Sequence, residues 1–588
     1  MAARSGGSVA THRSKRAGWH GPVIVLAVIL VAALVATGAI LFRRGAADGC
    51  SGSTTTIKVA ASPTHFGVVD ALAKEWSGRG PKVEGQCVAV TAVQKASAEV
   101  AATLGPNWDE SRDGPRPDVW MPDTRLWMLI ASTRPDGAAL LPREAPSVAT
   151  SQIVLALRRP VAQALGWPHK ALGWDEVLGA FARPDVWASV GHPEFAKLKM
   201  GMIDATASTA GLASTLALLD RDGDAKLSNQ EITISVASAQ VVGGQAPDPA
   251  AFMEDQADPN SVIAVFPVLE RDLAVYASSK PSAELVPIYA PVGPIVADFP
   301  YAVLNAPWVD PVRRETARQF LRYLDGSVGA DAFAAEGFRD AQQSIRDSSK
   351  LSSDLGFKPD LIQGRPLPSP AALSQLITDW TSLQRQSNIL AVLDTSGSMN
   401  QGVPGSKLTR LQLLQQTAMT GFSLLNVQSK IGLWHFSANL TPNRHYRELV
   451  PYGPLTDPVG SVPRSQALLG AVQALKAGGG TALYDTAYAA FRAMKGKWEP
   501  NDTNAVLLIT DGKNEVDGGL TLPQLLQRLG EEARVDQPIP IISIAVGPQA
   551  DANALRQISR ATGGRTFVVR DANTAVQTLV LAFAGRLS

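Results

Sequence analysis

An apolar run that ends in a carboxylate and two hydroxyls is the feature that most constrains the fold of this chain. Residues 389–393 are all apolar, and the sequence Asp-Thr-Ser-Gly-Ser follows them, with Asp394, Ser396 and Ser398 at alternate positions. A later apolar run likewise ends at Asp511. Because the carboxyl ends of parallel strands meet at one edge of an open α/β sheet, we expect these side chains to lie close together.

A further oxygen donor follows a glycine-rich turn between the two runs. Three glycines at 478–480 precede Thr481, so its hydroxyl follows a tight loop. A set of hard oxygen ligands with only two charges suits Mg²⁺, with Mn²⁺ or Ca²⁺ as alternatives. The competing interpretation is that these residues are ordinary Ser, Thr and Asp caps at the starts of helices.

The order DxSGS, then Thr, then Asp is that of a metal-ion-dependent adhesion site, and this region resembles a von Willebrand factor type A (vWA) domain. The resemblance implies that Ser396 and Ser398 bind the cation directly, and that Thr481 does so in the ligand-bound state. It implies that Asp394 and Asp511 act partly through water. It also implies recognition of a protein partner, whose Asp or Glu carboxylate fills an open coordination position of the metal.

The rest of the C-terminal third alternates between short apolar runs typical of buried strands and stretches with the apolar spacing of helices. Strands alternating with helices predict a mainly parallel, doubly wound sheet for a vWA domain at 386–588. The predicted helices are 408–425, 466–476, 482–494, 522–533, 552–562 and one from 573, and the further strands are 430–437, 539–546 and 566–569.

A long uncharged segment lies near the amino terminus. Residues 21–42 contain no charged residue over 22 positions. At about 1.5 Å per residue a helix of this length covers a bilayer core of about 30 Å. Lys and Arg residues are frequent in 1–20, which predicts a cytoplasmic tail, a single transmembrane helix and two extracytoplasmic domains. A cleaved signal peptide is the alternative, although its apolar region is normally shorter.

The two cysteines, Cys50 and Cys87, both follow this segment. An even number of cysteines in an oxidising compartment favours a disulfide between them. The alternative is a pair of buried, unpaired thiols.

The segment 56–351 has its own succession of strands and helices, with strand-like runs beginning at 57, 87, 118, 152, 200, 262, 285 and 301. This order resembles the periplasmic-type solute-binding proteins of ABC importers, which implies two α/β lobes around a cleft. Helices expected to start at Ser62 and Thr64, and at Ser208 and Thr209, would then face the cleft. Their backbone N–H groups suit an anion or a carboxylate, and simple helix capping is the alternative.

An acidic loop inside this segment resembles an EF-hand. Its ligand positions are Asp220, Asp222, Asp224, the carbonyl of Lys226, and Glu231, a spacing that encloses Ca²⁺. Ala225 replaces the usual glycine at the sharp turn. The alternative is a solvated acidic loop.

The remaining features narrow the function. Residues 352–385 are rich in proline, which indicates a semi-stiff linker. The charge balance, 54 Lys and Arg against 53 Asp and Glu, gives no basic surface for nucleic acid. No Walker A, GxSxG, HExxH or CxxC pattern occurs, so no enzyme activity is expected.

The sequence therefore predicts a membrane-anchored extracytoplasmic binding protein whose vWA domain recognises an acidic partner residue through Mg²⁺. The alternative is a receptor for a small solute, bound in the cleft and relayed to the vWA domain.

Overall fold

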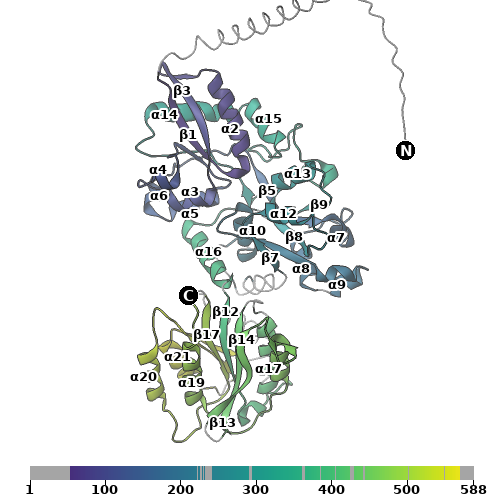
Figure 1. Ribbon diagram of the computed structural model, residues 1–588, viewed down its shortest axis with the longest axis vertical. Coiled ribbons are helices and arrows are strands. Elements are labelled where there is room, and N and C mark those ends of the chain that lie inside the picture. Colours follow the sequence, from purple (N-terminus) through teal and green to yellow (C-terminus); the bar gives the residue numbers. More distant parts are fainter. Residues whose placement is uncertain are drawn as a thin grey trace, which may run out of the picture.

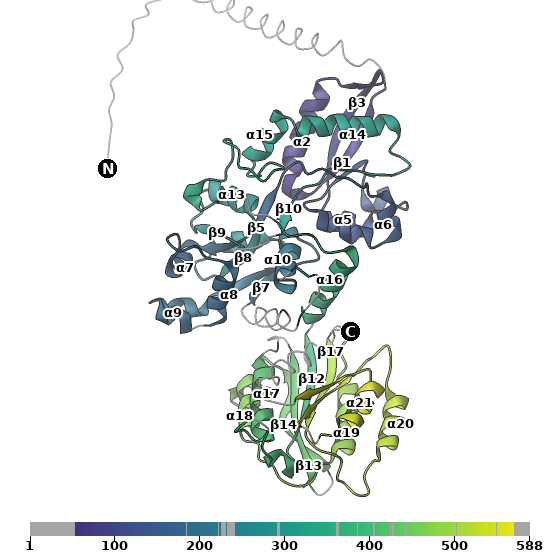
Figure 2. The same cartoon turned by 180° about the vertical axis from the view of Figure 1, so that it is seen from behind.

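The computed structural model describes residues 53–569 except 184, 222, 225–227, 229–230, 232–241, 291–294, 360–363, 385, 404–405, 424, 426–428, 442–443, 501 and 548–549. It confirms the predicted α/β class, with a two-lobed domain followed by a mainly parallel sheet (Figures 1 and 2). The expected cytoplasmic tail, the segment 21–42 and the helix from 573 lie outside the described residues. Within the described residues, no helix is both long and apolar enough to cross a bilayer.

The first lobe is built on a five-stranded sheet in the order β11-β4-β1-β3-β2. The strand β1 pairs in parallel with β3 and β4, while β2 and β11 are antiparallel to their neighbours. Trp76 and Phe320, on the two longest helices of the lobe, meet edge to face with ring centroids 5.8 Å apart. The elements are β1 (Thr55–Ala61), α2 (Pro63–Gly78), β2 (Lys82–Val83), β3 (Gln86–Gln94), α3 (Ser97–Thr103), α4 (Glu110–Asp113), β4 (Val119–Met121), α5 (Arg125–Ser132), α6 (Pro135–Leu140), β11 (Ala302–Val303), α14 (Pro311–Leu324) and α15 (Ser327–Ala335).

The second lobe has a six-stranded mixed sheet in the order β10-β5-β8-β6-β7, with β9 also paired to β5. The strands β5, β8 and β9 are almost entirely buried, as expected for a sheet covered on both faces. The elements are β5 (Ser151–Arg158), α7 (Arg159–Ala164), α8 (Trp174–Ala182), α9 (Asp185–Ser189), η1 (Pro193–Lys197), β6 (Lys199–Ile203), α10 (Thr209–Leu219), β7 (Val242–Ala246), α12 (Pro249–Asp255), β8 (Ile263–Leu269), α13 (Glu270–Ser278), β9 (Leu285–Tyr289) and β10 (Val296–Ala297).

The C-terminal domain is a six-stranded sheet in the order β14-β13-β12-β17-β18-β19, in which only the edge strand β14 is antiparallel. Helices α17 and α18 pack on one face, and α19, α20 and α21 pack on the other, so the buried strands are apolar on both sides. The elements are β12 (Ser387–Asp394), η3 (Gly397–Asn400), α17 (Arg410–Ser423), β13 (Lys430–Thr441), β14 (Arg444–Pro454), β15 (Pro458–Val459), β16 (Val462–Pro463), α18 (Arg464–Gln473), α19 (Leu483–Lys495), β17 (Thr503–Thr510), α20 (Leu522–Glu532), β18 (Ile541–Val546), α21 (Ala552–Ala561) and β19 (Thr566–Val569).

The proline-rich segment between the domains contains a short turn, η2 (Ser353–Leu355), and a helix, α16 (Pro370–Gln384). The side chains of Leu373, Leu376 and Trp380 are buried in the core of the first domain. The helix packs against α5 of the first lobe and α10 of the second, and both views show it between these helices and the C-terminal domain (Figures 1 and 2). The strand β12 begins three residues after α16 ends.

Candidate functional sites

The first site lies where β12 and β17 end. These strands are parallel neighbours at the centre of the sheet, so Asp394, the last residue of β12, and Asp511, which follows β17, emerge at the same edge. Backbone hydrogen bonds fasten the glycine-rich turn to this edge. The N–H of Gly397 donates to the carbonyl of Gly479 at 2.7 Å, and that of Gly478 donates to the carbonyl of Thr395 at 2.8 Å.

The five predicted metal-site residues meet at this edge. The hydroxyl oxygens of Ser396 and Ser398 are 3.0 Å apart, and the Ser398 hydroxyl donates to Oδ1 of Asp511 at 2.7 Å. The N–H of Ser396 donates to Oδ1 of Asp394 at 2.7 Å. The hydroxyl of Thr481 lies beside Gly512, where an added Cβ would be 2.6 Å from Thr481 Oγ1. A loop residue with a side chain at 512 would therefore displace the threonine hydroxyl from the site.

The electrostatics of the site favour a cation. Asp394 and Asp511 are both almost fully buried. Burial raises the pKa of Asp394 to about 6, and the nearby charge of Asp511 adds to the rise, although hydrogen bonds from Thr510 and Ser396 oppose it. Two buried carboxylates and three hydroxyls form a donor set that a hard divalent cation prefers. The residues present therefore fit Mg²⁺.

Two residues near this site carry no sequence signal that identifies them. The Nη1 of Arg410, the first residue of α17, is 2.7 Å from Oδ2 of Asp511, and both side chains are buried. Oε2 of Glu515 accepts a hydrogen bond from the N–H of Thr481 at 3.0 Å. An arginine at the start of an amphipathic helix reads as a surface residue, so only the fold reveals its contact with Asp511.

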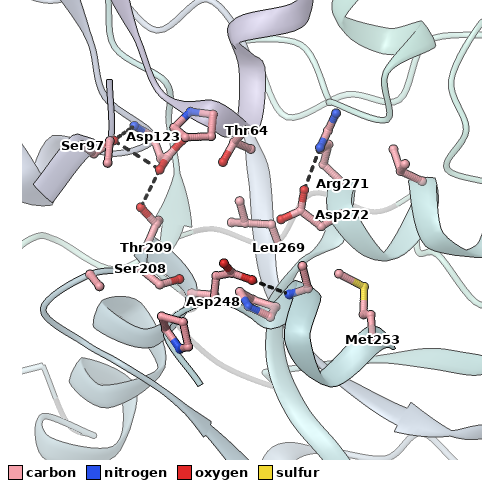
Figure 3. Close-up of a pocket in the computed structure, with 18 of the residues that line it drawn as sticks. Thr64, Ser97, Asp123, Ser208, Thr209, Asp248, Met253, Leu269, Arg271 and Asp272 are labelled. Atoms are coloured by element: carbon pink, nitrogen blue, oxygen red, sulfur yellow. Dashed lines mark hydrogen bonds and ion pairs between the residues drawn. The ribbon is translucent and has the colours of Figure 1, made fainter. Parts of the chain in front are cut away.

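The second site is a cavity of about 680 Å³ between the two lobes of the first domain (Figure 3). Thr64 and Asp123 line it from the first lobe, while Ser208 and Thr209 line it from the second. Three of the four predicted cleft residues therefore face the cavity. The fourth, Ser62, is not among its lining residues, and its hydroxyl donates to the carboxylate of Asp123.

Asp123, which no sequence motif marks, joins the two lobes at this cavity. The hydroxyls of Ser97 and Thr209 donate to its Oδ2 at 3.2 and 3.0 Å, and Thr209 belongs to the opposite lobe (Figure 3). Trp127 Nε1 donates to the Thr209 hydroxyl at 2.7 Å. Burial opposes ionisation of Asp123, but the interactions with His65, Ser62 and Thr209 outweigh it and hold the pKa of this carboxyl below its usual value. Asp123 is therefore an internal anion.

The acidic loop is described only in part, since Asp222 and Lys226 lie outside the described residues. Both oxygens of the Glu231 carboxylate accept backbone N–H groups, those of Arg221 and Ser228. The carboxylate of Asp220 lies 3.7 Å from Nη1 of Arg365. Asp224 is exposed. Calcium binding by this loop stays a prediction.

Cys87 is buried in β3. Its expected partner, Cys50, lies outside the described residues, so the disulfide also stays a prediction.

Two family models match the chain. The model for bacterial extracellular solute-binding proteins matches residues 57–339, and the model for the von Willebrand factor type A domain matches residues 388–581. Two uncharacterized proteins of Mycobacterium tuberculosis, Rv1836c of strain H37Rv and MT1884 of strain CDC 1551, are each 26% identical over 581 residues, covering 94% of this chain and 82% of their own.

Solved structures resemble each part separately. Iron-bound HitA from Pseudomonas aeruginosa is 15% identical with a TM-score of 0.38, and the match covers 56% of this chain and 99% of that one. The von Willebrand factor type A protein from Catenulispora acidiphila is 19% identical with a TM-score of 0.27, and the match covers 34% of this chain and 42% of that one. The chain therefore joins a bacterial extracellular solute-binding domain to a von Willebrand factor type A domain.

Proposed function

We propose that the C-terminal domain binds Mg²⁺ and uses it to recognise an acidic residue of a protein partner, on a chain that is anchored in the membrane by residues 21–42 with both domains outside the cytoplasm. The observation that carries the proposal is the convergence of Asp394, Ser396, Ser398 and Asp511 on one sheet edge, with Thr481 delivered by its glycine turn. Mn²⁺ and Ca²⁺ are the alternative cations.

The hydroxyls, the carboxylates and Arg410 have different roles at this proposed site. Ser396, Ser398 and Thr481 offer uncharged oxygens, so a bound cation would keep most of its charge and attract a carboxylate from outside. Asp394 and Asp511 orient the serines through the hydrogen bonds described above. Arg410 offsets the charge of Asp511 and leaves Asp394 as the less compensated anion. When bound, the metal supplies the coordination position that the partner's carboxylate fills.

The proposal is tested by calorimetric titration of the full-length chain in detergent micelles with MgCl₂. The variant Asp394→Asn combined with Ser398→Ala should lose Mg²⁺ binding while keeping the sheet, because neither change removes an apolar core group. Asp536→Asn is the matched control, since Asp536 is exposed and, within the described part of the chain, its ion pair is with Arg534. A partner recovered from membrane extracts should dissociate in EDTA. Equal recovery by wild type, variant and EDTA-treated protein would contradict the metal-bridged mechanism.

A second function is favoured by the cavity and by α16. We propose that the first domain is a receptor for a small solute and that α16 relays lobe closure to the C-terminal domain. The helix touches α5 in one lobe and α10 in the other. Its neighbour Arg365 donates to the carbonyl of Leu216 at the end of α10, at 2.9 Å. These contacts support the proposal that a change in the angle between the lobes moves α16, and with it the start of β12.

The receptor function is tested by incubating the full-length chain with a bacterial metabolite extract, washing it, and analysing released compounds by mass spectrometry. A retained compound should be lost when Asp123→Ala removes the bond between the lobes. Release of the same compounds from wild type and variant in equal amounts would contradict binding in the cleft.

A further inference from the structure

The charges that line the cleft between the lobes are strongly unequal. Among the described lining residues, four carboxylates stand against one guanidinium, and these residues are Asp123, Asp248, Glu254, Asp272 and Arg271. Figure 3 shows Thr64, Asp248 and Asp272 around the same central space, with Asp123 and Thr209 at its side. Family membership independently indicates that this cleft takes a ligand. The sign of the lining charge then decides what kind of ligand it is.

The hydroxyls at the two helix starts already bind a carboxylate of the protein. The hydroxyls of Ser62 and Thr209, at the starts of α2 and α10, both donate to Asp123. An anion entering here would have to approach the charged Asp123 carboxylate. Helix N-termini favour anions in general, but here the anion near them is the carboxylate of Asp123.

The guanidinium of Arg271 is committed as well. Its Nη1 donates to Oδ1 of Asp272 at 2.8 Å, and its Nη2 lies 3.6 Å from Oε2 of Glu336. It also stands over the ring of Phe338, 5.2 Å from the centroid. Two carboxylates therefore compensate this cation, and it offers little attraction to an anionic solute.

The carboxylates of the two lobes repel one another. Burial raises the pKa of Asp272, and the charges of Asp123 and Asp248 add to the rise, although Arg271 opposes it. Arg271 already offsets part of the charge of Asp272, and a further positive charge among these three carboxylates would relieve the repulsion that remains. Asp248 and Glu254 are exposed enough to turn toward it.

The rest of the lining is mainly apolar, with Pro63, Met253, Leu269 and Val275 among its members. We propose that the cleft binds a small organic cation, with an ammonium or guanidinium group among Asp123, Asp248 and Asp272 and an apolar body against these side chains. This assignment rests on the proposed receptor function. The assignment of a cation differs from the sequence-based expectation, in which the helix starts bind an anion.

The test uses a bacterial metabolite extract that is separated at pH 7 by ion exchange into cationic, neutral and anionic fractions. Each fraction is added to the full-length chain in buffer that already holds saturating MgCl₂ and CaCl₂, so that the proposed metal site is filled in every sample, and thermal stability and retained mass are measured. The cationic fraction should stabilise the protein and leave a retained compound, and the other two should not. Asp248→Asn should weaken binding of that compound by about tenfold, as expected for the loss of one bond to a charged group.

The control is Asp258→Asn, on the same lobe. Asp248 and Asp258 each accept a backbone N–H from the residue two positions later, at 2.8 Å, but only Asp248 lines the cavity. Asparagine preserves both turns, so a folding defect would affect the two variants alike. The control should bind the compound like the wild type.

The outcomes separate the two proposals. Stabilisation by the anionic or the neutral fraction would overturn the assignment of a cation and leave the receptor function standing. No binding from any fraction would contradict the receptor function itself, and the ligand class with it. Equal weakening in Asp248→Asn and Asp258→Asn would show that Asp248 does not contact the ligand.

Discussion

Asp394 and Asp511 share one sheet edge, but their surroundings differ. Asp394 accepts hydrogen bonds from the N–H of Ser396 and the hydroxyl of Thr510, which are both uncharged. Asp511 accepts from the Ser398 hydroxyl and from the guanidinium of Arg410. The two carboxylates are therefore expected to respond differently to pH and to substitution.

The first prediction concerns pH in metal-free buffer. The folded-state pKa of Asp394, about 6, lies above the ordinary value of 3.8, so the folded state binds more protons between those values. The free energy of unfolding should fall as pH rises from about 4 to about 6, by at most about 3 kcal/mol. Calorimetry of the chain in EDTA should show this fall for wild type and a flatter profile for Asp394→Asn. Identical profiles would contradict the raised pKa.

The second prediction concerns the buried pair. Asp511→Ala should destabilise the C-terminal domain by roughly 3–5 kcal/mol, because it removes the carboxylate that Arg410 contacts in a buried position. The double variant Asp511→Ala with Arg410→Met should recover much of that loss, since it removes the charge as well. Thermal unfolding of the single and double variants measures the difference. A double variant that is less stable than Asp511→Ala would contradict this account.

At the scale of elements, the parallel strands and their helices follow from sequence because each carries its own periodicity. Strand β12 is apolar over most of its length, and α17 begins two residues inside the predicted 408–425. Strand β14 was not predicted, because its sequence Arg-His-Tyr-Arg-Glu-Leu-Val-Pro-Tyr-Gly-Pro is polar and contains proline, as an exposed edge allows. This strand forms through its pairing with β13, which no local pattern encodes.

The same distinction applies to the candidate sites. The five residues predicted to form a metal site belong to short motifs, so their proximity was predictable from the order of the motifs. Arg410 and Asp511 are 101 positions apart, and Asp123 and Thr209 are 86 apart. Contacts over such separations depend on the packing of whole elements. The contact of Arg410 with Asp511, and that of Asp123 with Thr209, could therefore not be predicted from the sequence.

The third prediction concerns α16. Leu376→Ala combined with Trp380→Ala should detach the helix from the first domain, because both side chains are buried there. The segment between the domains should then be cut faster by protease, by about tenfold or more, with the two domains still folded. Thr378→Ala, at an exposed position of the same helix, is the control. Equal cleavage of all three proteins would show that the packing of α16 does not hold in solution.

At the scale of the whole molecule, the two domains have separate cores and meet through a short connection. Buried apolar residues of both lobes and of α16 form one cluster, a second cluster is centred on the second lobe, and those of the C-terminal domain form two clusters on either side of its sheet. Each domain is therefore expected to hold its own ligand site, and the proposed anchor at 21–42 would place both sites in the same compartment.

The fourth prediction concerns that compartment. If residues 21–42 anchor the chain with 1–20 in the cytoplasm, protease added to intact spheroplasts should remove both domains and leave a membrane-bound stub. Epitope tags at the two ends of the chain report the products on a blot. Protection of the C-terminal tag, while a control ectodomain is digested, would contradict this orientation.

The placement of α16 has a consequence for how the molecule is regulated. A helix that contacts both lobes and continues into the central strand of the next domain makes any coupling between the two sites mutual, because a coupling free energy acts equally in both directions. If a bound solute raises the affinity for the metal by some factor, the bound metal raises the affinity for the solute by the same factor. Either site can then regulate the other, and which one does so depends on which ligand is limiting. A partner bound to the C-terminal domain would change how much solute the first domain binds.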